Sequence, residues 1–259
     1  MPACTGRRGL RGGRFFVAAL AVLLALPGLS LAGWGAAPTS RGVDGNGLPG
    51  GRQATAPAAT VTVARVFDGD TCRLADGRVL RLAGVDAPET AHGGAPAQYY
   101  AAEAAAAFAR LVTGKPLGLV VSGDGGDRFG RLLGDLRLPD GTSVTEALLA
   151  RGAVFVFWHR DMAEVDFERL LAVQRRAMGT GQGMWPRLLD GPPPARPFVG
   201  NANSRRFHAW DCPEAARVSP RNRVLLRNLG DAFGRGFAPA RECTPWPAAR
   251  RGQGPAPDG

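Results

Sequence analysis

The chain has 259 residues, which is enough for one or two domains of ordinary size. Hydrophobic residues make up 45% of the sequence, enough for a real core, and four cysteines are too few for a disulfide-dense scaffold. The formal net charge of +10 suits a polyanionic partner, although frequent use of arginine in a GC-rich genome explains the same excess.

Residues 1–32 have the pattern of a cleavable export signal. Four arginines precede an apolar run over residues 15–26, a Pro-Gly break follows, and a small-x-Ala cleavage site ends at Ala32. Because the apolar run is shorter than the roughly 20 residues that span a bilayer, we expect cleavage rather than a permanent anchor. The mature protein is then expected to be secreted or periplasmic in a bacterium, without stable membrane association, and its formal charge falls from +10 to +6.

Residues 33–58 are rich in Gly, Ala, Pro and Thr and lack apolar periodicity, which predicts a disordered linker. The region 59–188 that follows, here called the barrel region, alternates between strand-like and helix-like patterns. The predicted strands are 59–67, 71–74, 78–85, 117–121 and 132–138, and the predicted helices are 96–112, a short one beginning at Ser143, and 166–178. This order predicts an α+β fold and is compatible, among other options, with a five-stranded barrel of the OB type.

Residues 189–197 predict a stiff Pro-rich linker. Residues 198–247, here called the C-terminal module, read as a small α/β unit, and residues 248–259 as a disordered tail.

Charged side chains of the kinds that phosphodiester cleavage needs are concentrated in residues 68–89. Carboxylates suit a hard cation and can orient or deprotonate an attacking water, while arginine forks can bind the negative charge of the transition state. The candidates are Asp68, Asp70, Arg81, Asp86 and Glu89, with Arg131 from a separate turn. Each of them taken singly reads better as a turn or surface charge, so the hypothesis depends on their joint occurrence.

The spacing of Arg81 and Asp86 raises a geometric condition. Residues five apart on a regular strand face opposite sides, so the two side chains share a site only if the strand ends or bends near Gly84. Pro88 makes such an ending plausible.

Three ordered motifs resemble the staphylococcal nuclease (thermonuclease) family. They are Val-Phe-Asp-Gly-Asp-Thr at 66–71, Arg-Leu-Ala-Gly-Val-Asp-Ala-Pro-Glu-Thr at 81–90, and Asp-Arg-Phe-Gly-Arg at 127–131. Tyr100 with Glu103, the segment 147–152 and Gly-Met-Trp at 183–185 also match, so the resemblance covers about half of the chain.

The resemblance implies an OB-fold barrel with three helices and a calcium-dependent endonuclease that acts on DNA and RNA. In the family pattern Asp70 and Asp86 bind the metal ion together with the backbone carbonyl of Ala87, and Asp68 lies behind them. Glu89 holds or activates the water, and Arg81 and Arg131 clamp the scissile phosphate. The 5′-oxygen leaves, which gives 3′-phosphate ends.

Two departures from the family lie at the rim of the expected site. Arg128 and Phe129 stand where the best-known member has Lys-Tyr; the arginine keeps the charge, and the phenylalanine keeps a surface for stacking. Trp158 falls near an aromatic residue that stacks on the nucleotide, although a core tryptophan is an equally good interpretation.

The C-terminal module is similar to a small zinc-binding domain related to the metal-binding domain of the alkylation-repair methyltransferase. His208, Cys212 and Cys243 match three of the four ligand positions, and Ala240 occupies the remaining one. Because structural zinc sites are almost always four-coordinate, a degenerate module without zinc is the competing interpretation.

The sequence therefore predicts a secreted, monomeric, calcium-dependent nuclease. The alternative is a nucleic-acid-binding protein without catalysis, and the charged set at 70, 81, 86, 89 and 131 favours the enzyme, because a protein that only binds does not need it.

Overall fold

The computed structural model describes residues 59–91, 93–123, 126–192, 194–241 and 246. The expected signal 1–32, the linker 33–58 and the tail 248–259 lie outside the described residues. Among the described residues, no helix is long and apolar enough to span a bilayer.

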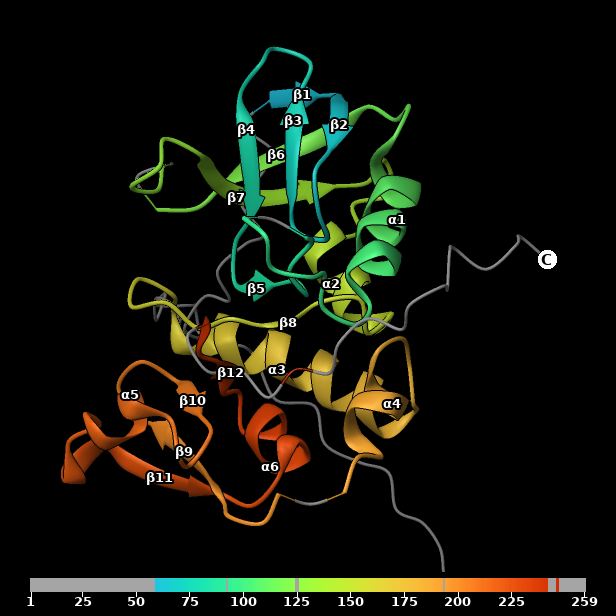
Figure 1. Cartoon of the computed structure of the whole chain (residues 1–259). Helices are drawn as coiled ribbons and strands as arrows, with labels where there is room; N and C mark the ends of the chain where they lie inside the picture. Colours follow the sequence, from blue (N-terminus) through green and yellow to red (C-terminus); the bar gives the residue numbers. More distant parts are fainter. Residues whose placement is uncertain (1–58, 92, 124–125, 193, 242–245, 247–259) are drawn as a thin grey trace, which may run out of the picture. The chain divides into compact units, whose positions relative to one another are not determined.

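A six-stranded sheet in the order β1-β6-β7-β4-β3-β2 forms the centre of the barrel region (Figure 1). Its strands are β1 (Ala59–Val61), β2 (Val63–Val66), β3 (Thr71–Leu74), β4 (Val79–Leu82), β6 (Leu117–Val121) and β7 (Leu132–Arg137). All neighbouring pairs are antiparallel except β4 and β7, which run parallel. Buried Leu74, Leu80, Leu117 and Leu136 belong to the core that this sheet encloses.

The predicted strand 59–67 is divided between the two edges of the sheet. β1 pairs with β6 at one edge, and β2 pairs with β3 at the other, with only Thr62 between them. The sheet therefore curls so that both edges meet the same short segment, as a barrel requires. The structure has six strands in this sheet instead of the five predicted, because one predicted strand serves both edges.

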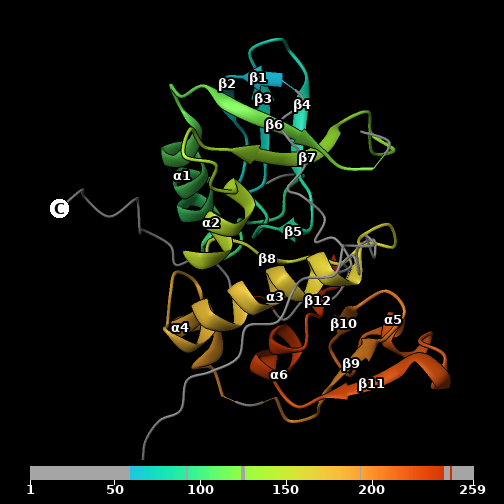
Figure 2. The same ribbon diagram turned by 180° about the vertical axis from the view of Figure 1, so that it is seen from behind.

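Two helices cover the sheet on one side, as Figures 1 and 2 show from opposite directions. α1 (Ala101–Val112) buries Ala104, Phe108 and Val112 against the core. α2 (Val144–Ala150) begins where predicted, because the Ser143 hydroxyl accepts a hydrogen bond from the Glu146 backbone amide at 3.1 Å.

The first predicted helix begins five residues later than expected. Tyr100 has φ of 73°, which no residue inside an α-helix adopts, so residues 96–100 stay outside α1. Gln98 in this segment pairs instead with the backbone of Glu89. Propensity alone favours helix in this alanine-rich stretch, and the tertiary contact overrides it.

A two-stranded sheet and two helices complete the barrel region. β5 (Val85–Asp86) pairs with β8 (Phe155–Val156), and α3 (Glu164–Gly179) is followed by the short α4 (Trp185–Leu189). α3 contains the predicted helix 166–178, whereas β8 and α4 were not predicted.

The C-terminal module forms a four-stranded sheet in the order β11-β9-β10-β12. Its elements are β9 (Phe198–Asn201), β10 (Arg206–His208), α5 (Pro213–Ala216), a 3-10 helix (Pro220–Asn222), β11 (Arg223–Leu226), α6 (Leu229–Gly234) and β12 (Ala238–Pro239). One apolar cluster joins Phe155 and Trp185 of the barrel region to Phe207 and Phe233 of the module. The two parts therefore share a core, and α3 lies between their sheets in both views (Figures 1 and 2).

Candidate active site

Asp70 lies at the end of the turn between β2 and β3, and the residue is only 2% exposed. Its backbone amide donates to the Asp68 carboxylate at 3.0 Å, which closes the turn. The Asp70 carboxylate accepts from the Ala87 amide at 2.9 Å and from the Thr71 hydroxyl at 2.7 Å. Gly69 allows this approach, because a Cβ there would lie 2.7 Å from the Cβ of Ala87.

One guanidinium joins the two buried aspartates. Arg81 donates through Nη1 to Asp70 and through Nη2 to Asp86. The condition set by their spacing is met, because β4 ends at Leu82 and the chain bends at Gly84 before β5 begins. Gly84 has φ of +78°, and a Cβ there would meet the Met162 methyl group at 2.5 Å.

Burial and ion pairing shift the pKa values in this cluster in opposite directions. Burial raises the pKa of Asp70 well above its usual range, Arg81 opposes that shift, and the carboxylates of Asp86 and Asp68 add to it. Burial lowers the pKa of Arg81, but Asp70 and Asp86 outweigh burial and hold the guanidinium charged. The two aspartates therefore depend on one positive charge between them.

Glu89 follows β5 and is half-buried. Gln98 fixes its backbone from both sides: the Gln98 side-chain oxygen accepts from the Glu89 amide at 2.8 Å, and the Gln98 amide donates to the Glu89 carbonyl at 2.9 Å. The Glu89 carboxylate is 3.1 Å from the guanidinium of Arg241, which also lies 3.9 Å from Asp86. A residue of the C-terminal module thus reaches the carboxylates of the barrel region.

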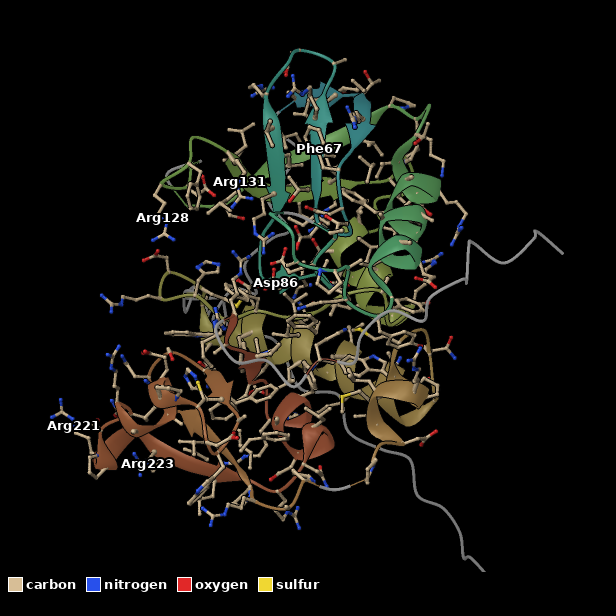
Figure 3. All side chains as sticks on the ribbon, viewed as in Figure 1. Phe67, Asp86, Arg128, Arg131, Arg221 and Arg223 are labelled. Carbon is tan, nitrogen blue, oxygen red and sulfur yellow. The ribbon has the colours of Figure 1, made fainter. Side chains whose placement is uncertain are left out.

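The turn 127–131 is organised by Asp127. Its carboxylate accepts from the Phe129 amide at 2.9 Å, from the Arg131 amide at 3.0 Å and from Arg131 Nε at 2.8 Å. Burial raises the pKa of Asp127, but these hydrogen bonds outweigh it and lower that pKa. Phe129 is 66% exposed, and the guanidinium of Arg128 lies 4.7 Å from the centre of its ring. The turn therefore presents two arginines, both labelled in Figure 3, together with an exposed aromatic ring.

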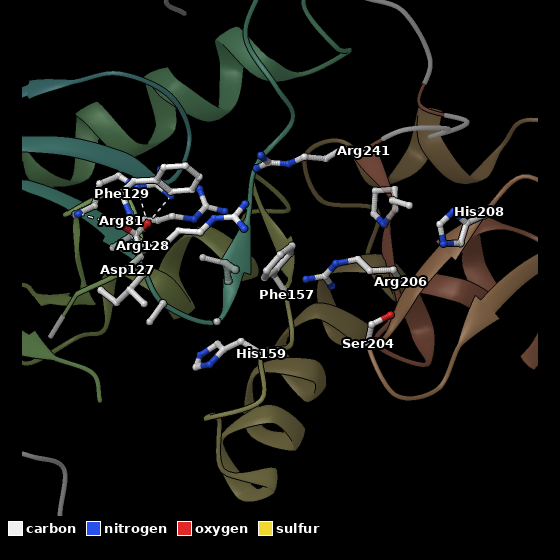
Figure 4. Close-up of a pocket in the computed structure, with 18 of the residues that line it drawn as sticks. Arg81, Asp127, Arg128, Phe129, Phe157, His159, Ser204, Arg206, His208 and Arg241 are labelled. Carbon is white, nitrogen blue, oxygen red and sulfur yellow. Dashed lines mark hydrogen bonds and ion pairs between the residues drawn. The ribbon is translucent and has the colours of Figure 1, made fainter. Parts of the chain in front are cut away.

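A pocket of about 670 Å³ lies between this turn and the C-terminal module (Figure 4). Its charged and aromatic lining is Arg81, Asp127, Arg128, Phe129, Arg131, Phe157 and His159 from the barrel region, and Arg206, His208, Glu214 and Arg241 from the module. Asp70, Asp86 and Glu89 are not part of the lining; Arg81 and Arg241 connect them to it. The predicted phosphate clamps, Arg81 and Arg131, thus line one pocket beside the predicted metal-binding carboxylates.

Sequence reasoning missed Gln98, Phe157 and Arg241. Trp158, the predicted stacking residue, packs partly buried against the main core, and its carbonyl accepts from Arg206 Nη2 at 3.3 Å. The neighbouring Phe157 lines the pocket instead. The alternation after β8 was the available signal, because adjacent residues of an extended segment face opposite sides.

The zinc site expected in the C-terminal module stays a prediction. His208 and Cys212 do lie together, with Nδ1 and Sγ 3.9 Å apart, but Cys212 is disulfide-bonded and offers no thiolate. Cys72 is a free, buried thiol, and Cys243 lies outside the described residues. Within the part of the chain that the structure describes, no three His, Cys, Asp or Glu side chains are grouped to hold a metal ion.

Comparison with known families gives a match over residues 79–187 to the model of staphylococcal nuclease homologues. The matched stretch contains Arg81, Asp86, Glu89 and Arg131; Asp70 precedes it.

Relatives occur in fungi and bacteria. A probable endonuclease LCL3 of Komagataella phaffii is 33% identical over 116 residues, which is 41% of this chain and 48% of the relative. One of Schizophyllum commune is 31% identical over 127 residues, covering 45% of this chain and 43% of the relative. The chain thus spans about half the length of these fungal relatives. An uncharacterized endonuclease of Escherichia coli O157:H7 is 32% identical over 134 residues, covering 51% of this chain and 80% of the relative.

Proposed function

The chain belongs to the staphylococcal nuclease homologue family, and from this membership and the site geometry we propose that it is an endonuclease that hydrolyses phosphodiester bonds of DNA and RNA. The observation that carries the proposal is Arg81 bound to both Asp70 and Asp86 beside a pocket lined by arginines. A site that only binds nucleic acid has no need for two buried carboxylates that share one cation.

The donor set fits a hard cation such as calcium. Two buried carboxylates already require positive charge between them, and carboxylate oxygens with a backbone carbonyl are the ligands that calcium prefers. We propose that Asp70, Asp86 and the Ala87 carbonyl hold it, with Asp68 fixing the turn behind Asp70. When bound, the cation supplies positive charge that polarises a phosphate oxygen.

The remaining residues have separate tasks in the proposed reaction. Glu89, held by Gln98, orients a water molecule and accepts its proton as the water oxygen bonds to phosphorus. Arg81, released from the aspartates, and Arg131 bind the phosphate oxygens, on which negative charge grows. The bond from phosphorus to the 5′-oxygen breaks, and the leaving oxygen takes a proton from solvent, so the product carries a 3′-phosphate.

The test is incubation of the purified protein with plasmid DNA and with RNA, in calcium and in excess chelator. We expect both substrates to be cut in calcium only, and Glu89→Gln to lower the rate by at least about 100-fold. Glu168→Gln, at an exposed position of α3, is the matched control and should cut at the wild-type rate. Binding without cleavage in calcium would favour the alternative, a protein that binds nucleic acid without catalysis.

We also propose that the protein is exported. The disulfide bond of Cys212 supports this, because disulfides persist in oxidising compartments and are rare in the bacterial cytoplasm. Cell fractionation tests the proposal: the protein should be found in the periplasm or the medium, with the chain beginning after Ala32. Recovery of the intact chain from the cytoplasm would contradict it.

A further inference from the structure

Arg206 projects from β10 of the C-terminal module toward the barrel region. Its guanidinium carbon lies 3.4 Å from the centre of the Phe157 ring, and its Nη2 donates to the Trp158 carbonyl at 3.3 Å. Figure 4 shows this side chain pointing into the pocket beside Phe157. Stacking on the ring and the hydrogen bond to the backbone hold the guanidinium in one position.

The other terminal nitrogen of Arg206 lacks an acceptor among the described residues. Nη1 is buried and makes no hydrogen bond to any residue that the structure describes. Burial lowers the pKa of Arg206 to about 10; Asp86 opposes this shift, while Arg241 and Arg81 add to it. The group still carries its charge at neutral pH, so a buried charged donor is left unsatisfied, which is costly unless a ligand supplies the acceptor.

Arg241 reaches the same region from the end of β12. Its side chain is 68% exposed, and its guanidinium contacts the carboxylate of Glu89. In Figure 4 Arg206 and Arg241 approach the pocket from the module, opposite Arg81 and Arg128 of the barrel region. Arginines of the two parts thus face one another across the pocket.

Arginines outnumber carboxylates in the pocket lining that the structure describes. Five arginines line it, at positions 81, 128, 131, 206 and 241, with two carboxylates. Arg81 and Arg241 also pair with carboxylates behind the lining, those of Asp70, Asp86 and Glu89. Asp127 is bound to Arg131, and Glu214 to Arg217 on the module's surface. Arginine binds phosphate oxygens through parallel hydrogen bonds, and the volume of about 670 Å³ is in the range of small-ligand sites.

We propose that Arg206 and Arg241 form a binding subsite for a phosphate group of the nucleic-acid chain other than the one that is cleaved. The C-terminal module is then part of the substrate-binding site, and Phe157 serves as the support on which Arg206 rests. This inference rests on the proposed function for the identity of the ligand.

Binding in excess chelator tests the subsite without cleavage. The probes are a fluorescent oligothymidylate of about eight nucleotides, with several phosphates, and a dinucleotide with a single phosphate. Arg206→Gln and Arg241→Gln should each weaken binding of the longer probe by about tenfold more than binding of the dinucleotide. Each should also lower the slope of log K against log salt by about 0.7, the share of one phosphate contact to a single strand.

Two variants separate the subsite from general effects. Arg221→Gln removes an exposed arginine of the module that does not line the pocket, and it should bind both probes as wild type does. Arg206→Lys keeps the charge without the fork and should recover part of the affinity that Arg206→Gln loses. If Arg206→Gln does not fold, Arg241→Gln alone tests the subsite. The side chain of Arg241 is largely exposed, so its replacement should not disturb the fold.

Three results would overturn the proposal. Equal losses in Arg221→Gln and Arg241→Gln would show a diffuse electrostatic effect. Equal losses on both probes would place the arginines at the scissile phosphate. Faster cleavage by Arg241→Gln would show that Arg241 blocks Glu89. Because binding is measured in chelator, a protein that never cleaves can still retain the subsite, whereas failure of both probes to bind wild type would remove the proposed function as well.

Discussion

Gln174 of α3 donates from Nε2 to the backbone carbonyl of Phe233, 59 residues further along the chain, at 2.7 Å. Its side-chain oxygen accepts from the Val156 amide of β8, also at 2.7 Å, and the side chain is fully buried. One amide group therefore satisfies a backbone donor of the barrel region and a backbone acceptor of the C-terminal module.

Gln174→Leu should destabilise the protein, because it leaves the buried Val156 amide without its acceptor and removes one of the two donors to the Phe233 carbonyl, which also accepts from the Gly236 amide at 3.0 Å. We expect the free energy of unfolding to fall by about 1–3 kcal/mol, measured with urea. Gln182→Leu, at an exposed position after α3, should change stability by less than about 0.5 kcal/mol. Equal effects of the two substitutions would show that Gln174 does not join the two parts.

Arg81→Met should lower the stability of the protein in chelator and increase its stabilisation by calcium. Without Arg81 the buried Asp70 and Asp86 repel each other, so we expect the free energy of unfolding in chelator to fall by about 3 kcal/mol. Calcium should then stabilise the variant more than it stabilises wild type, where the guanidinium competes for the same carboxylates. Urea unfolding with and without calcium measures this, and cleavage should be lost.

The control for that experiment is Arg78→Met, which removes an exposed arginine paired with Asp76. It should leave both stability and the calcium effect close to wild type. If calcium stabilised Arg81→Met and wild type equally, the cation would not bind between the two aspartates.

Asp127→Asn should loosen the turn that presents Arg131. The amide cannot accept from both backbone donors and from Arg131 Nε, so we expect KM to rise about tenfold with little change in the fold. Asp161→Asn, at an exposed position, is the control and should keep the wild-type KM.

The pH dependence of stability gives an independent test of the hydrogen bonds that the Asp127 carboxylate accepts. The pKa of Asp127 is lowered in the folded state. Its contribution to the free energy of unfolding is therefore complete above the pKa of the unfolded state, about 4, and is lost as the pH falls through the pKa of the folded state. The difference in unfolding free energy between wild type and Asp127→Asn should therefore be constant above about pH 5 and shrink in acid. A difference that does not change with pH would show that the carboxylate is not held in this way.

Reduction should destabilise the protein through Cys212. We expect dithiothreitol to lower the free energy of unfolding by about 2–4 kcal/mol, as loss of a native disulfide typically does. The variant Cys212→Ser should respond to dithiothreitol not at all, whereas Cys72→Ala, at the free thiol, should respond as wild type does. The same dithiothreitol sensitivity in Cys212→Ser would contradict the assignment.

The clustering of Asp70, Arg81 and Asp86 and the bend that permits it were predictable from local sequence. Asp70 follows a strand and a turn. Gly84 takes a positive φ that other residues rarely adopt, so a few consecutive residues determine the bend between Arg81 and Asp86. The cap at Ser143 was predictable for the same reason. The Glu146 side chain pairs with Arg169 of α3.

The C-terminal half of the pocket was not predictable. Arg206 and Arg241 reach the pocket only because the module packs on the barrel region. This packing brings Arg206 onto Phe157, 49 positions earlier in the chain, and Arg241 to Glu89. The arginines of a basic surface look alike in a sequence, and burial alone singles out Arg206. β8 was missed because its two residues are too short for alternation to be read.

The division of one segment between both edges of the barrel sheet has a further consequence. A single proteolytic cut near Thr62 would leave β1 held to β6 by the pairing of three residues alone, whereas β2 would stay joined to β3 through the turn that follows it. Loss of β1 would expose the unpaired backbone groups of β6. A single cut in this segment would therefore open the closed sheet and leave an unpaired strand edge, which favours aggregation.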